Sequence, residues 1–187
     1  MGIKKYQIIY ADPCWQYKDK SKSHGGGAES HYPCMSIKEL CALNVKDIAA
    51  EDSVLLMWVT MPMLEVGFEV IKAWGFKYKT CAFTWVKTNK DKSIYMGMGR
   101  HTRGNAEICL LATKGKGVPR KNAGIYNTQL HQRGRHSEKP DTFRDNIISL
   151  YGIDTTRIEL FARKTSSDWD VWGNEVESDI SINNYIL

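Results

Sequence analysis

The sequence predicts an α/β protein whose mostly parallel sheet is flanked by helices. Two apolar runs, at 6–11 and 54–59, have the length and near-continuous hydrophobicity of strands that are buried on both faces. The segment 63–74 has apolar residues at helical spacing, and Pro140 suits the first turn of a helix over 139–151. Strands and helices that alternate along a chain favour a parallel sheet.

The first predicted strand leads into a turn and then into a polar stretch. Asp12-Pro13-Cys14-Trp15 directly follows the strand. The Gly-rich stretch 18–30 has no periodicity and is expected to be a loop, either a lid over a bound ligand or a plain surface loop. Ser36, with Glu39 three residues later, predicts a capping box that opens a helix through about Leu43.

The second half of the chain continues the alternation. The helix over 63–74 is expected to end with Gly75 in the position just past its C-cap. The segment 115–136 is loop-like and rich in Gly, Lys, Arg and Asn. Further strands are predicted at 79–87, 107–113 and 157–162.

Length and composition indicate one globular domain. The chain has 187 residues, of which 42% are hydrophobic and 25% charged, and we expect a single domain over 1–176 with a C-terminal tail over 177–187. No apolar stretch approaches the roughly 20 residues of a membrane span, and the first residues do not resemble a secretory signal. We therefore expect a cytoplasmic protein without membrane contact. The G-x-G-x-x-G fingerprint is missing, which disfavours a dinucleotide-dependent dehydrogenase.

The cysteines indicate a reducing compartment. Their number is odd and no C-x-x-C pair is present, so we expect reduced thiols. A zinc site built from His31, Cys34 and Cys41 would not match a common ligand spacing, and no metal is expected. The five cysteines are Cys14, Cys34, Cys41, Cys81 and Cys109.

The net charge of +5 is unevenly distributed. Segment 100–139 has nine Lys and Arg residues against Glu107 and Glu138, a net charge of +7, so the remainder of the chain carries −2. Clustered cations suit a polyanionic partner, because phosphates are bound by Lys and Arg. A solvated basic face is the alternative interpretation.

The segment Asp12-Pro13-Cys14-Trp15 combines groups that suit methylation of an exocyclic amine on a nucleobase. Ligands of open α/β sheets gather at the carboxyl ends of strands, where this segment is expected to lie. The Asp12 carboxylate and the Pro13 carbonyl can accept hydrogen bonds from the amine and orient its lone pair. Trp15 can stack on the base, a contact worth roughly 1–3 kcal/mol. An Asp-Pro turn with a Trp in the core is the alternative.

Eight segments together resemble the adenine N6-methyltransferases typified by the catalytic subunit of the eukaryotic messenger-RNA adenosine methyltransferase, a family with many bacterial and phage DNA adenine methyltransferases. The resemblance runs from Tyr6 to about Val176. Cys14 replaces the second proline of the family's Asp-Pro-Pro-Trp motif. The segments are 12–15, His31-Tyr32-Pro33-Cys34-Met35-Ser36, Leu56-Met57-Trp58-Val59-Thr60, Trp85-Val86-Lys87-Thr88-Asn89, Asn105-Ala106-Glu107-Ile108-Cys109-Leu110, His136-Ser137-Glu138-Lys139-Pro140-Asp141, Glu159-Leu160-Phe161-Ala162-Arg163 and Trp172-Gly173-Asn174-Glu175.

The resemblance implies a Rossmann-like, S-adenosylmethionine-dependent methyltransferase fold with the permuted (beta-class) order, in which the catalytic strand precedes the cofactor-binding strand. It implies Asp12, Pro13 and Trp15 as catalytic residues. Lys139, at the start of a helix, would pair with the carboxylate of the cofactor. The cofactor-binding residues implied by the resemblance are Asp12, Lys139, Phe161, Arg163, Asn174 and Glu175.

The function that we expect is transfer of a methyl group from S-adenosylmethionine to the N6 amine of adenine in nucleic acid. DNA is favoured over RNA because the compact single-domain relatives are typically bacterial or phage DNA modifiers. The enzyme would be a site-specific DNA adenine methyltransferase and can be expected to form a homodimer. Three alternatives stay open: a cytosine N4-methyltransferase, a catalytically silent nucleic-acid-binding subunit, and an unrelated α/β nucleotide-binding protein.

Residues expected to bind the nucleic acid are aromatic or basic. Tyr17 or Tyr32 would form a second wall against the base, opposite Trp15. A base in a duplex would have to be flipped out, at a cost of a few kcal/mol. Cations of the basic segment would bind phosphates, namely Arg100, Arg103, Lys114, Arg120, Lys121, Arg133 and Arg135.

Overall fold

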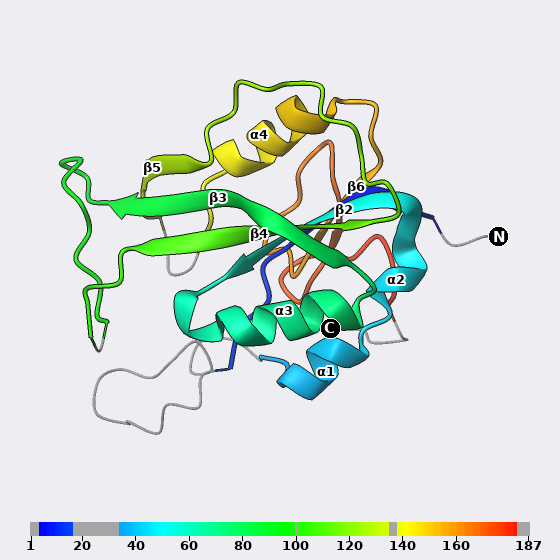
Figure 1. Ribbon diagram of the computed structural model, residues 1–187, viewed down its shortest axis with the longest axis horizontal. Coiled ribbons are helices and arrows are strands. Elements are labelled where there is room, and N and C mark those ends of the chain that lie inside the picture. The colour runs from blue at the N-terminus through cyan, green and yellow to red at the C-terminus, as the bar shows by residue number, and fades with distance from the viewer. Residues whose placement is uncertain (1–3, 17–33, 100, 135–137, 183–187) are drawn as a thin grey trace.

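In the part of the chain that the structure describes, a seven-stranded sheet organises the molecule (Figure 1). The computed structural model describes residues 4–16, 34–99, 101–134 and 138–182. Within them the strand order is β5-β3-β4-β2-β1-β6-β7. The strands are β1 (Tyr6–Ala11), β2 (Ala49–Val59), β3 (Lys77–Thr88), β4 (Ala106–Lys114), β5 (Thr128–Gln132), β6 (Arg157–Leu160) and β7 (Asp170–Trp172).

The predicted mostly parallel sheet is confirmed. β1 pairs in parallel with β2 and β6, β6 with β7, and β3 with β5. β4 alone of these strands runs the other way, antiparallel to both β2 and β3. β1 and β6 are direct neighbours although nearly the whole chain separates them, so the first strand of the sequence lies inside the sheet, as the permuted order requires.

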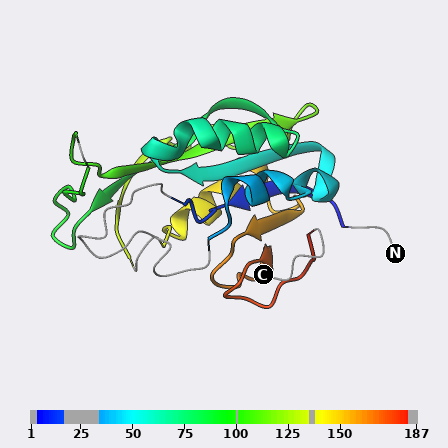
Figure 2. The ribbon, with the colours of Figure 1, turned by 90° about the horizontal axis from the view of Figure 1, so that it is seen from below.

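Helices cover both faces of the sheet (Figure 2). α1 (Ile37–Ala42), α2 (Val45–Ile48) and α3 (Leu64–Ala73) pack with one set of strand side chains, and α4 (Thr142–Tyr151) packs with the other. The division follows the alternation of side chains along a strand. In β1, Ile9 belongs to the cluster that contains α3, whereas Ile8 and Tyr10 belong to the cluster that contains α4. A short 3-10 turn, η2 (Met61–Met63), leads into α3.

The predicted helix boundaries are confirmed at α1 and α3. The Ser36 hydroxyl accepts from the Glu39 N–H at 3.3 Å, and the Glu39 carboxylate accepts from the Ser36 N–H at 2.7 Å. Together they form the expected capping box. Gly75 has φ +82°, a left-handed conformation that favours glycine, and it directly follows the C-cap Trp74.

Other boundaries were wrong or missed. The helix predicted over 139–151 begins only at Thr142, so Lys139 and Pro140 precede it. β5 lies in the segment predicted as a loop, because its sequence Thr-Gln-Leu-His-Gln is polar and no residue in it is buried. β7 was not predicted either. The N–H of Val171, in this strand, donates to the Asp179 carboxylate at 2.8 Å. Residues 178–182, assigned to a tail, thus pack on this strand, with Ile182 in the core.

Two of the five cysteines are not free thiols. Cys14 and Cys34 form a disulfide, with their Cα atoms 5.1 Å apart, so the prediction that all five are reduced is wrong for this pair. Cys41, Cys81 and Cys109 are free. His31 lies outside the described residues. Among those residues, no group of His, Cys, Asp and Glu side chains is arranged to bind a metal ion.

Reduction of the Cys14–Cys34 bond is expected to lower the free energy of unfolding by about 3 kcal/mol, because the bond closes a loop between residues 20 positions apart. Urea unfolding with and without dithiothreitol measures the effect. The double variant Cys14→Ser/Cys34→Ser serves as the control and should no longer respond to the reductant. Identical unfolding midpoints of the wild type in both conditions would contradict the prediction.

Within the described part of the chain, no helix combines the length and the apolar composition that crossing a membrane requires.

Candidate active site

The site lies where the direction of the chain connections changes in the sheet. β1 continues through α1 and α2 to β2 on one side, whereas β6 continues to β7 on the other. Ligands of open α/β sheets bind at such a switch point, outside the carboxyl ends of the strands. Asp12 directly follows β1, and its N–H donates to the Leu160 carbonyl of β6 at 3.3 Å. The carboxylate of Asp12 is therefore fixed at the switch point.

The Asp12 carboxylate is held by Lys139. The ammonium group of Lys139 donates to both carboxylate oxygens, at 2.8 and 2.7 Å. The same ammonium lies 3.2 Å from Glu107, at the start of β4, and 5.5 Å from the ring centre of Trp58. Only 5% of the Lys139 side chain is exposed, so this cation is buried between two carboxylates.

A fourth charge completes a chain of alternating sign. Lys87, near the end of β3, forms an ion pair with Glu107 through Oε1, whereas Lys139 contacts Oε2. The order is Lys87, Glu107, Lys139, Asp12, and the formal charges sum to zero. Each of these buried or half-buried groups faces one of opposite formal charge, which offsets the cost of removing a charge from water.

The pKa values follow from burial and from this pairing. Burial raises the pKa of Asp12 and outweighs the opposing effect of Lys139. Burial would also raise the pKa of Glu107, but Lys139 and Lys87 together outweigh it and hold that pKa below its usual range. Burial would lower the pKa of Lys139, but the two carboxylates raise it well above its usual value, so this side chain stays cationic.

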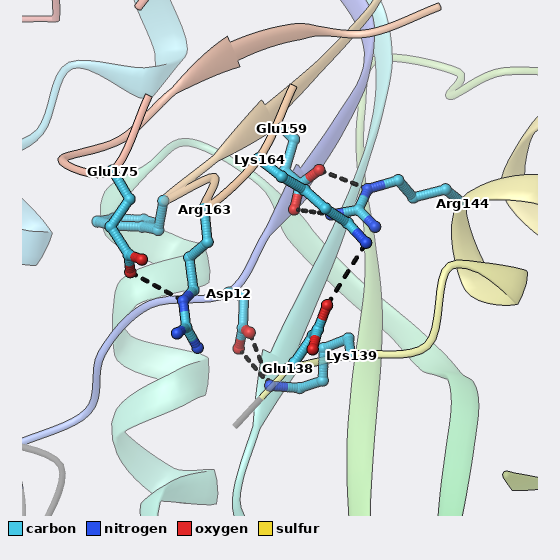
Figure 3. A pocket seen from close by; sticks show the side chains of 9 residues that line it. Asp12, Glu138, Lys139, Arg144, Glu159, Arg163, Lys164 and Glu175 are labelled. Carbon is cyan, nitrogen blue, oxygen red and sulfur yellow. Dashed lines mark hydrogen bonds and ion pairs between the residues drawn. The ribbon is translucent and has the colours of Figure 1, made fainter. Parts of the chain in front are cut away.

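A pocket opens beside Asp12 between the ends of β1 and β6 (Figure 3). Five of the six residues expected to bind the cofactor line it, and the exception is Asn174, which is exposed. Figure 3 shows Asp12 and Lys139 facing each other, with Arg163 and Glu175 on one side of them. The lining residues are Asp12, Glu138, Lys139, Arg144, Glu159, Phe161, Arg163, Lys164 and Glu175.

The wall formed by β6 and the residues after it carries paired charges. Arg144, on α4, donates to the two carboxylate oxygens of Glu159 at 2.6 and 2.7 Å, and both side chains are buried. Burial raises the pKa of Glu159, against the opposing effect of Arg144. Arg163 donates to Glu175 at 2.8 Å. The pocket therefore presents both signs of charge within a short distance.

Phe161 turns the chain at the end of β6. Its φ of +63° is uncommon for a residue with a side chain and is stabilised here by packing. The ring stacks on Trp74 at a centroid distance of 6.5 Å and meets Trp172 edge to face at 5.3 Å. Arg163, two residues after Phe161, also lines the pocket.

Trp15 lies deeper than a stacking platform requires. Its side chain belongs to the core, the residue is 5% exposed, and the indole N–H donates to the Trp58 carbonyl at 3.1 Å. In this arrangement Trp15 anchors the turn that contains Asp12, and its stacking on a base stays a prediction. Tyr17 and Tyr32 lie outside the described residues, as does the loop 18–30.

The structure does not bring the predicted phosphate-binding cations together. Arg103 and Arg133 lie at the carboxyl ends of the parallel strands, the edge of the sheet that contains the site. Arg103 is in the connection from β3 to β4, and the backbone N–H of Arg133 donates to the Thr88 carbonyl at the end of β3. Lys114 pairs with Ser53 at the opposite edge, because β4 is antiparallel. Lys121, next to Arg120, is also at that opposite edge, paired with Asp154 at 3.1 Å. Arg100 and Arg135 lie outside the described residues.

Lys87 and Glu107 belong to the charge chain of the site, although the sequence assigned no role to either. The same holds for four residues that line the pocket, namely Glu138, Arg144, Glu159 and Lys164. Lys87 and Glu107 both occur in segments that carry the family resemblance, Trp85-Val86-Lys87-Thr88-Asn89 and Asn105-Ala106-Glu107-Ile108-Cys109-Leu110. A charged residue near the end of one predicted strand and one at the start of the next was the available signal. Their contact with Lys139 depends on the order of strands in the sheet, which these segments alone do not reveal.

Known proteins are similar to this chain over nearly its whole length. The MT-A70 family model matches residues 6–175. The type II methyltransferase M.MunI of Mycoplasma sp is 40% identical over 191 residues, which cover 92% of this chain and 78% of that protein. The human N(6)-adenosine-methyltransferase catalytic subunit METTL3 is 27% identical, over 94% of this chain but 29% of its own length. The N(6)-adenosine-methyltransferase MT-A70-like protein of Drosophila melanogaster is 28% identical, over 94% of this chain and 28% of its own length.

A mostly parallel sheet with an aspartate at the switch point, combined with these matches, defines an α/β methyltransferase fold. The chain belongs to the MT-A70 family of N6-adenine methyltransferases. The family resemblance predicted from the sequence is confirmed. The chain spans less than a third of the length of the eukaryotic relatives named here and most of the length of M.MunI.

Proposed function

We propose that this protein transfers a methyl group from S-adenosylmethionine to the N6 amine of adenine in DNA. The observation that carries the proposal is the Asp12 carboxylate, fixed at the switch point of the sheet and open to a charged pocket. The family membership supports adenine N6 as the acceptor atom.

The pocket suits a zwitterionic cofactor. S-Adenosylmethionine has a carboxylate, an ammonium, a sulfonium and ribose hydroxyls, and the pocket wall offers cations and carboxylates in alternation. Arg163 and Lys164 are cations at its rim, and Glu175, whose side chain is 42% exposed, can accept from hydroxyl groups. Lys139, which was expected to pair with the carboxylate of the cofactor, is already paired with Asp12 and Glu107. Its role in the proposed reaction therefore includes holding the Asp12 carboxylate. The cofactor supplies an electrophilic methyl group.

Asp12 and Pro13 would act on the amine. An exocyclic amine is a weak nucleophile because its lone pair is delocalised into the ring. A carboxylate has about four acceptor positions, so Asp12 can bind the amine hydrogens while it also accepts from Lys139. The Pro13 carbonyl is the second acceptor. Hydrogen bonds from the amine to both groups concentrate electron density on the nitrogen and fix its direction of attack.

DNA is proposed over RNA because the chain is 40% identical to the type II methyltransferase M.MunI, against 27% and 28% to the two N(6)-adenosine-methyltransferases named above.

Labelled S-adenosylmethionine, incubated with the protein and duplex DNA, single-stranded DNA or RNA, tests the proposal by nucleoside mass spectrometry. N6-methyladenine from duplex DNA is the expected product. N4-methylcytosine would identify the other amine as the acceptor, and a product from RNA alone would contradict the proposed substrate. Absence of both product and cofactor binding would favour a catalytically silent binding subunit.

The two groups of cations are expected to differ in their effect on DNA binding. Arg103→Gln and Arg133→Gln, at the edge that contains the site, should each weaken binding and reduce the slope of log K against log salt by about 1, because one phosphate contact is lost. Fluorescence anisotropy over a range of salt concentrations measures this. Lys114→Gln and Lys121→Gln, at the opposite edge, are the matched controls and should leave the slope unchanged. Equal effects from both pairs would show that DNA contacts both edges.

A further inference from the structure

Glu107 and Lys87 have no role in the proposed reaction, yet they complete the charge chain of the site. Glu107 lies at the start of β4, and 11% of its side chain is exposed. Lys87 lies two residues along β3 from Trp85, the residue that pairs with Glu107 in the sheet. The Lys87 N–H donates to the Asn105 carbonyl at 2.8 Å, and its ammonium lies 5.0 Å from the Trp85 ring centre. Backbone and side-chain contacts thus hold this ion pair in one place.

Lys139 connects this pair to Asp12. Its ammonium is shared between the Asp12 carboxylate, at 2.7 and 2.8 Å, and the Glu107 carboxylate, at 3.2 Å. A buried ammonium with Asp12 as its main anionic neighbour would neutralise that carboxylate and weaken it as an acceptor. Sharing the cation with Glu107 leaves more negative charge on Asp12. The strength of Asp12 as an acceptor therefore depends on a residue that lies beyond Lys139.

We propose that Glu107, held by Lys87, is a positioning residue that fixes the Lys139 ammonium and keeps the Asp12 carboxylate a strong acceptor for the amine of the substrate. This inference rests on the proposed function. The electrostatics of the site agree with this geometry. Burial is the main cause of the raised pKa of Asp12, and the negative charge of Glu107 adds to it. Lys139 and Lys87 together lower the pKa of Glu107.

Glu107→Gln tests the role of the charge. The side chain keeps its size, but Lys139 is then neutralised mainly by Asp12. We expect kcat to fall by on the order of 10-fold to 100-fold, with KM for the cofactor within about threefold of the wild type. The acid limb of kcat/KM should move to lower pH, because loss of the neighbouring negative charge lowers the pKa of Asp12.

Lys87 provides a second, independent test. Lys87→Met removes the cation that holds Glu107 and should lower kcat in the same direction as Glu107→Gln. Lys87→Arg keeps the charge and should recover most of the activity. Glu51→Gln, at the exposed amino end of β2, is the matched control and should leave kcat and the pH profile unchanged.

The outcomes separate a positioning role from a structural one. An acid limb that moves to higher pH in Glu107→Gln would mean that Lys139 has been displaced from Asp12, and would overturn the inference. A wild-type kcat with an unmoved limb would overturn it as well. Thermal unfolding of each variant shows whether it is folded. If Glu107→Gln is not folded, the comparison of kcat between Lys87→Arg and Lys87→Met tests the inference instead.

Failure of the proposed function is recognised separately. It appears in the wild type itself, as the absence of N6-methyladenine from every nucleic acid. In that case the titration of the Asp12 carboxyl, followed by carbon NMR without substrate, still tests the inference: its pKa should be lower in Glu107→Gln than in the wild type. An equal or higher pKa would overturn it.

Discussion

Asp12→Asn is expected to lower kcat for adenine methylation by about 10³-fold, because it removes the charged acceptor at the reacting nitrogen. The asparagine side chain keeps the size of the aspartate and one acceptor oxygen, but it loses the negative charge and presents N–H groups towards Lys139. Asp12→Ala should remove turnover as well. Binding of S-adenosylmethionine should stay within a few-fold of the wild type, because the rest of the pocket wall is formed by other residues.

Nucleoside mass spectrometry measures the product of each variant, and calorimetric titration measures cofactor binding. Asp154→Asn is the matched control: its side chain is 81% exposed and lies at the opposite edge of the sheet, so activity should not change. A near wild-type rate in Asp12→Asn and Asp12→Ala would refute the assigned role of Asp12. Loss of cofactor binding together with activity would show that Asp12 acts mainly on the cofactor.

Arg144→Met is expected to lower the free energy of unfolding by about 3–5 kcal/mol, because Glu159 is left buried without its partner. Glu159 already has a raised pKa from burial, and loss of the arginine raises it further. A carboxyl whose pKa is higher in the folded than in the unfolded state binds more protons when folded, so the variant loses stability as pH rises. The destabilisation should therefore be larger at pH 8 than at pH 5.

Urea unfolding at the two pH values measures this effect. Arg144→Met/Glu159→Met replaces both charges by apolar groups and should recover most of the lost stability. Lys121→Met, in an exposed ion pair, is the control and should cost less than about 1 kcal/mol. A loss below 1 kcal/mol in Arg144→Met, or a loss that does not depend on pH, would contradict the argument.

Much of the fold could be predicted from local sequence signals. Ser36 and Glu39 sit three residues apart, and the capping box forms within that span. Gly75 ends α3 because only a residue without a side chain adopts its φ easily. β5 was missed because it is a short, polar edge strand, half exposed, in which no hydrophobic pattern was available to detect. The start of α4 was set three residues too early because Pro140 is also compatible with the turn before a helix.

By itself, the sequence determined the class of protein and the position of its central carboxylate, since a buried strand followed by Asp12 and an ordered set of segments are local properties of the chain. Only the tertiary structure decided what surrounds that carboxylate. Lys139 lies 127 residues from Asp12, Glu107 meets Lys139 from β4, and Lys87 meets Glu107 from β3. The antiparallel β4 likewise divides the basic segment, because it carries Lys114 to the far edge while Arg103, which precedes β4, stays at the edge that contains the site. Charges that are distant in the chain interact through space, so the order and direction of the strands, rather than any motif, set the electrostatics of the site.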